Sequence, residues 1–159
     1  MGNFLQKSPA SAYDKTLTIQ LKQRTLRELM ECMTVLQEDY ADCQCLTYDQ
    51  FEDIFCPIFD DPEQFFKVLQ NEQSLEGTVD VYETLAAIAI FSGEKFERKA
   101  AFVFKLFDFD QNGTLEKSEM VLTLQSAVRG LCKFVGINPP SLKTLADLAD
   151  TIFAVIDHD

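Results

Sequence analysis

The segment that most constrains this chain is the run Asp-Phe-Asp-Gln-Asn-Gly-Thr-Leu-Glu-Lys-Ser-Glu at positions 108–119. It matches the pattern D-x-[DN]-x-[DN]-G-x5-E at every specified position. Calcium prefers six to eight oxygen ligands. The candidate donors are the side chains of Asp108, Asp110 and Asn112, the carbonyl of Thr114, Glu116 through a water, and both oxygens of Glu119. Gly113 allows the sharp bend between the two halves. The pattern therefore predicts a Ca²⁺-binding loop.

The residues on both sides of this loop have helical periodicity. Residues 96–107 place apolar side chains at helical spacing, and a second helical pattern runs from about Lys117 to Phe134. A helix, a twelve-residue calcium loop and a second helix together make an EF-hand.

A related segment at 39–50 has the length of such a loop but lacks its ligands. Ala41 and Cys43 offer no side-chain oxygen at positions 3 and 5, Gln44 replaces the bend glycine, and Gln50 replaces the closing glutamate. Leu46 keeps the hydrophobic residue of position 8. We expect a degenerate hand that binds no calcium.

A second related segment, at 72–83, keeps the register better, with Gly77 at position 6 and Val79 at position 8. The leading ligand is a glutamate, one methylene longer than aspartate, and a serine at position 3 is a weak neutral donor. We expect weak or no calcium binding here. The candidate ligands are Glu72, Ser74, Glu76, Thr78 and Glu83.

The sequence ends with the start of a fourth hand. Residues 152–159 align with residues 103–110, which puts Asp157 and Asp159 at loop positions 1 and 3. A site also needs positions 5, 7 and 12, so the given chain is either truncated in this loop or continues beyond it. His158, at loop position 2, is expected to be exposed and not to be a ligand.

These patterns predict an all-α fold of paired EF-hands in two lobes, with the C-terminal lobe truncated within its last hand. We expect a flexible N-terminus at 1–14, an N-terminal pair of hands at 15–93 and a C-terminal pair at 94–159. The apolar pattern from Lys15 to Gln37 predicts one continuous helix.

The charge distribution excludes several classes of partner. The formal net charge is -12, although residues 1–27 carry +4. An acidic body argues against binding to nucleic acid or to anionic lipid. Met1 and Gly2 could begin an N-myristoylation motif, but Gln6 stands where Ser or Thr is required. We therefore expect a membrane contact only if Gly2 is acylated.

Five cysteines, no signal peptide and no apolar run of membrane-spanning length indicate a reducing cytoplasmic location. Cys43 and Cys45 are close in sequence, but no second cysteine pair accompanies them, so free thiols are favoured over a zinc site. Two exposed thiols in one loop could still be sensitive to oxidation. No histidine, cysteine or serine lies in a recognisable nucleophile arrangement, so we expect no enzyme.

Loop starts at 39, 72, 108 and 157 define an internal repeat. With the long third gap, the degenerate cysteine-bearing first hand and the Met-Gly start, the chain resembles the neuronal calcium sensor-like branch of the calmodulin superfamily. That branch includes calaxin-type and docking-complex subunits of ciliary dynein arms. The resemblance implies a cytosolic calcium sensor that grips an amphipathic helix of a target protein through an apolar groove. The alternative is a non-switching subunit of a larger assembly such as the ciliary axoneme, with one calcium kept for stability.

Overall fold

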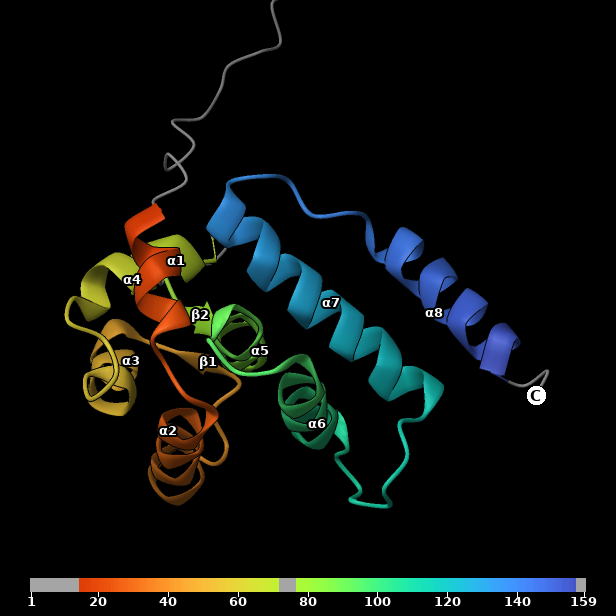
Figure 1. The fold of residues 1–159 in the computed structure, drawn as a ribbon, viewed down its shortest axis with the longest axis horizontal. Coiled ribbons are helices and arrows are strands. Elements are labelled where there is room, and N and C mark those ends of the chain that lie inside the picture. The colour runs from red at the N-terminus through yellow and green to blue at the C-terminus, as the bar shows by residue number, and fades with distance from the viewer. Residues whose placement is uncertain (1–14, 72–76, 157–159) are drawn as a thin grey trace, which may run out of the picture.

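The computed structural model describes residues 15–71 and 77–156. The segment 1–14, the candidate ligands Glu72, Ser74 and Glu76, and residues 157–159 with His158 lie outside the described residues. The described chain forms these elements in order (Figure 1): α1 (Lys15–Lys22), α2 (Leu26–Asp39), β1 (Cys45–Leu46), α3 (Tyr48–Phe55), α4 (Pro62–Leu69), β2 (Val79–Asp80), α5 (Val81–Phe91), α6 (Phe96–Phe107), α7 (Lys117–Val135) and α8 (Leu142–Ile156). The predicted all-α fold is confirmed.

The prediction of one helix from Lys15 to Gln37 is wrong, because the helix is interrupted between the end of α1 at Lys22 and the start of α2 at Leu26. Thr25 caps α2: its hydroxyl accepts a hydrogen bond from the Glu28 N–H at 3.3 Å, and the Glu28 carboxylate accepts from the Thr25 N–H at 2.7 Å. This reciprocal capping box satisfies two N–H groups that a helix start leaves without partners. The Thr-x-x-Glu signal is present in the sequence but lies inside an unbroken apolar pattern.

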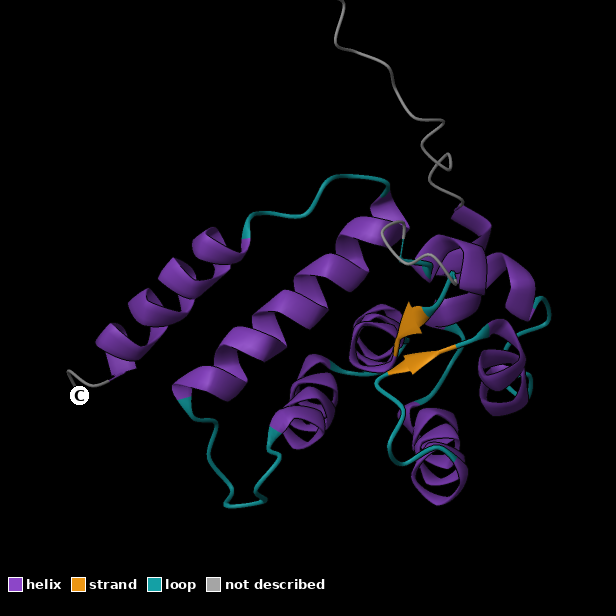
Figure 2. Ribbon diagram, turned by 180° about the vertical axis from the view of Figure 1, so that it is seen from behind, coloured by secondary structure: helices purple, strands orange, loops and turns teal. Residues whose placement is uncertain are grey.

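The first two hands are joined through their loops by a short antiparallel ladder of β1 and β2 (Figure 2). Leu46 pairs with Val79, and both side chains are fully buried. These are the position-8 residues of the two loop segments, so the predicted register of both is confirmed. The degenerate first loop therefore keeps the shape that pairs hands although it lacks calcium ligands.

Side-chain caps start the helices that follow. Thr47 caps α3: its hydroxyl accepts from the Gln50 N–H at 3.5 Å, and the side chain of Gln50, at the closing position of the first loop, accepts from the Thr47 N–H at 3.0 Å. Asp61 accepts from the Gln64 N–H at 3.2 Å and caps α4. Asp80 does the same for α5 through the Glu83 N–H at 2.8 Å.

Aromatic side chains make up much of the core. Phe59 and Phe65 stack with centroids 3.9 Å apart, and Phe51 contacts both Phe55 and Phe66. Phenylalanines of the third hand join the same buried cluster, so one core spans α1 to α7. The predicted boundary between two lobes at residue 93 stays a prediction.

Helix α7 is the long element that connects the parts of the fold. It packs across α5 on one side and lies alongside α8 on the other (Figure 1). Gly136 ends it in the left-handed conformation, with φ +69°. Ser141 caps α8, accepting from the Thr144 N–H at 3.1 Å. In the described part of the chain, none of the helices has the length and apolar character needed to cross a membrane.

The environments of the cysteines predict their order of reactivity. Cys45 and Cys56 are exposed, whereas Cys32 and Cys132 are buried. Burial, followed by the nearby Glu31 carboxylate, raises the pKa of Cys32 to about 11, and burial also raises the pKa of Cys132. Because the thiolate is the reactive form, these two thiols should be inert at pH 8.

We predict that native protein treated with iodoacetamide at pH 8 is modified at Cys45 and Cys56, and that Cys32 and Cys132 react only after denaturation. Peptide mass spectrometry measures this directly. Labelling of Cys32 at the same rate as Cys45 in the native chain would contradict the described packing.

Candidate metal centre

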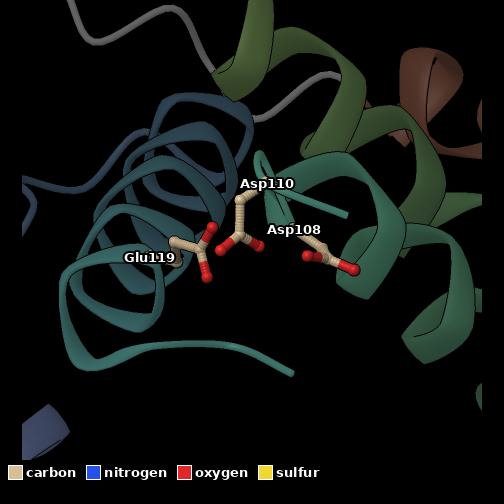
Figure 3. Close-up of side chains that lie close together, drawn as sticks. All are labelled: Asp108, Asp110 and Glu119. Atoms are coloured by element: carbon tan, nitrogen blue, oxygen red, sulfur yellow. The ribbon is translucent and has the colours of Figure 1, made fainter. Parts of the chain in front are cut away.

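The loop between α6 and α7 brings three carboxylates together. Asp108 and Asp110 follow the end of α6, and Glu119 lies in the first turn of α7 (Figure 3). One oxygen from each lies within 4.8 Å of the others. Among residues 15–71 and 77–156, this is the one group of three or more potential metal-binding side chains of this kind. The sequence pattern predicted these three residues.

The spacing of these carboxylates fits a calcium ion. Protein oxygens lie 2.3–2.6 Å from calcium, so two oxygens on opposite sides of it are roughly 5 Å apart. The separations of up to 4.8 Å between Asp108, Asp110 and Glu119 are within that limit. A hard divalent cation suits such an all-oxygen donor set. The residues present therefore fit the metal that the sequence pattern implies.

Backbone N–H groups hold the aspartates in place. Asp108 accepts from the N–H groups of Asn112 and Gly113, each at 3.1 Å. Asp110 accepts from the Asn112 N–H at 3.1 Å and from its side-chain amide at 2.7 Å. The Asn112 side-chain oxygen in turn accepts from the Thr114 N–H at 2.7 Å. The loop thus positions its donor groups through its own backbone.

Glu119 is the buried member of the set, with a side chain in the first turn of α7. It accepts from the Phe109 N–H at 3.0 Å and from the Glu116 N–H at 2.9 Å. Its exposed fraction is 7%, while Asp110 and Glu116 are exposed. Burial of a carboxylate is costly without partners, and neutral N–H groups do not cancel its charge. A cation bound at this position would supply the counter-charge that the N–H groups do not.

The loop has two residues with positive φ. Gly113 lies at φ +80°, where a side chain would be strained, as the bend position predicts. Gln111 lies at φ +56°, although it is not a glycine. Nothing in the sequence pattern indicated this second position, because loop position 4 is unspecified.

Aromatic contacts attach the loop to the N-terminal hands. Phe109, which is loop position 2, contacts Tyr82 of α5 edge-to-face at 5.5 Å, and Tyr82 also contacts Phe107 at 5.7 Å. Burial raises the pKa of Tyr82, with a further contribution from Asp80. The start of the loop is therefore packed against the exiting helix of the second hand.

The second loop shows a different arrangement at its closing position. Glu83 is buried, and its carboxylate forms ion pairs with Arg129 and Lys133 of α7. The carbonyl of Thr78 accepts from the Asn71 N–H at 2.8 Å. The sequence pattern did not predict the contacts of Glu83, because its partners lie about fifty residues away.

Comparison with known proteins places the chain among regulatory EF-hand proteins. It is 30% identical to recoverin of Homo sapiens over 157 residues, which span 95% of this chain and 74% of recoverin. It is 28% identical to S-modulin of Aquarana catesbeiana over 127 residues, 76% of this chain and 61% of S-modulin. It is 26% identical to guanylyl cyclase-activating protein 2 of Gallus gallus over 113 residues, 61% of this chain and 57% of that protein.

No family model and no solved structure matches the chain. The relatives are regulatory proteins and not enzymes, in agreement with the expected lack of catalytic activity. The extent of the match to recoverin also agrees with the resemblance inferred from the loop spacing and the degenerate first hand. The chain belongs to the neuronal calcium sensor family of EF-hand proteins.

Proposed function

We propose that this protein is a calcium sensor whose response passes through the loop 108–119. The observation that carries the proposal is the convergence of Asp108, Asp110 and Glu119 within 4.8 Å at the junction of α6 and α7. The proposed ligands are these three carboxylates, the Asn112 side chain and the Thr114 carbonyl, with Glu116 acting through a water.

Glu119 connects the metal to the fold because it belongs to the first turn of α7. Its two oxygens now accept from Phe109 and Glu116. Calcium coordination by both oxygens would change those contacts and so act on the orientation of α7 relative to α6. Helix reorientation of this kind is how sensor EF-hands expose apolar surface.

A groove between α2 and α6 is the proposed docking site for a target. Its volume is about 530 Å³, and α6, one of its walls, leads directly into the calcium loop. The apolar lining is contributed by Leu26, Met30, Met33, Ala101 and Phe102. Methionine side chains adapt readily to different apolar partners.

The charges around this groove favour an acidic partner. Arg27, Arg98 and Lys105 line it together with one acid, Glu94, in a chain whose overall net charge is -12. Arg27 pairs with Glu31 and Arg98 with Glu94, both on the surface, so Lys105 is the lining cation that has no ion-pair partner among the described residues. We therefore propose that the target is an amphipathic helix with an apolar stripe flanked by acidic residues.

We further propose that the protein acts in the cytoplasm. A non-switching subunit would bind its partner equally well with and without calcium.

Replacement of Glu119 by Gln tests the ligand assignment. Gln keeps a carbonyl oxygen for one of the N–H donors but removes the charge and the bidentate mode of binding, so we predict at least a tenfold loss of calcium affinity in calorimetry. Glu116→Gln is the control and should lose less calcium affinity than Glu119→Gln, because position 9 acts through a water. Unchanged affinity of Glu119→Gln would rule out this loop as the calcium site.

Replacement of Met30 by Glu tests the groove. Met30 is 58% exposed, so the change should not affect folding, but it places a negative charge where an acidic helix would dock. We predict that a fluorescent model helix with a leucine stripe and glutamate flanks binds in calcium, and that Met30→Glu weakens binding about tenfold, roughly 1.4 kcal/mol.

Ile19→Glu is the matched control, because Ile19 is 55% exposed on α1, outside the groove. Fluorescence anisotropy measures both variants with calcium and with a chelator. Equal binding by wild type and Met30→Glu would contradict the groove assignment. Equal binding with and without calcium would favour the non-switching alternative.

A further inference from the structure

Both oxygens of the buried Glu83 carboxylate face a cation of α7. One oxygen, Oε1, lies 2.8 Å from Arg129 Nε, and the other, Oε2, lies 2.5 Å from Lys133 Nζ. Lys133 also donates to the carbonyl of Leu69 at the end of α4, at 2.8 Å. The Glu83 side chain is 7% exposed. One buried carboxylate thus ties α5 to α7, and Lys133 extends the contact to α4.

Glu83 also occupies the closing position of the second loop, where an EF-hand uses both glutamate oxygens to hold calcium. The same two oxygens cannot bind calcium while Arg129 and Lys133 hold them. Release of Glu83 to a metal would leave two partly buried cations without their counter-charge, which is unfavourable. The family pattern implies a calcium ligand at this position, and the contacts made by this chain do not fit it.

The sequence of α7 permits the close approach to α5 that these ion pairs require. Arg129 and Lys133 are four residues apart and so lie on one face of the helix. Between them, Gly130 lets α7 approach α5 closely: a Cβ at Gly130 would lie 2.7 Å from the Glu83 carbonyl oxygen and 2.9 Å from the Ala87 Cβ.

The next buried residue on α7, Phe134, packs against rings of two other helices. Its ring centroid lies 5.3 Å from that of Phe91 and 6.2 Å from that of Phe65. The ion pairs therefore sit at the edge of a packed apolar interface. This packing fixes the position of both cations relative to Glu83.

We propose that Glu83 is not a calcium ligand but the anchor of an internal clamp, in which Arg129 and Lys133 take the place of the cation and fix α7 to the N-terminal hands. The second hand is then calcium-free for a structural reason, whatever its other ligands offer. The clamp uses described residues alone and does not depend on calcium binding in the loop 108–119.

A double-mutant cycle in the chain of residues 1–159 tests the clamp. Glu83→Gln and Lys133→Met should each lower the urea midpoint of unfolding in EDTA, and the double variant should lose less than the sum of the two, because the interaction is already absent in each single variant. Lys143→Met is the control: its ion pair with Asp147 is exposed, so its midpoint should not change. Additive losses, or no loss, would overturn the clamp.

Calcium stoichiometry by calorimetry provides the second readout and remains valid if Glu83→Gln is too unstable to purify. In the Glu119→Gln background, the clamp predicts that no strong calcium site remains. A strong site that persists in Glu119→Gln, and is lost on adding either Glu83→Gln or, should that variant not fold, Glu83→Asp, would make Glu83 a ligand and overturn the proposal. If wild type binds no calcium, the proposed sensor function fails while the urea cycle still decides the clamp.

Discussion

A carboxylate can be buried only where something offsets the loss of its hydration. In the described part of the chain, two acidic side chains are buried, Glu83 and Glu119. Both stand at the closing position of a twelve-residue loop, and the fold satisfies them differently. Glu83 faces two cations from α7, whereas Glu119 receives two neutral N–H groups. This contrast accounts for the different roles that we assign to the two loops.

Helix α7 connects these two glutamates. It begins with Glu119 in its first turn and carries Arg129 and Lys133 near its end. Along its length it packs on α5, and Phe134 joins the core of the N-terminal hands. In our proposal, calcium binding at loop 108–119 changes the orientation of the first turn of α7 relative to α6, while the ion pairs of Glu83 hold the other end of α7 in place. Because α6 is one wall of the groove beside α2, this reorientation changes the shape of the groove.

Local sequence signals predicted much of this architecture. The loop pattern predicted the positions of Asp108, Asp110 and Glu119, and it placed Leu46 and Val79 at position 8 of their loops, where the structure pairs them. The break at Thr25 was missed because the apolar periodicity of α1 and α2 continues across it, although its capping box is visible in the sequence. The partners of Glu83 could not be read locally, because an ion pair across fifty residues depends on how α5 and α7 pack.

The central claim is that calcium acts through loop 108–119 and not through the second loop. The chemical shifts of the Gly113 and Gly77 amide protons test this claim. Gly113 donates to the Asp108 carboxylate at 3.1 Å, and Gly77 holds the equivalent loop position in the second hand. In a ¹H–¹⁵N correlation spectrum, calcium should move the Gly113 amide proton strongly downfield, because its hydrogen bond to a metal-held carboxylate strengthens, while Gly77 shifts little. A downfield shift of Gly77 equal to that of Gly113, or no shift of Gly113, would contradict the account.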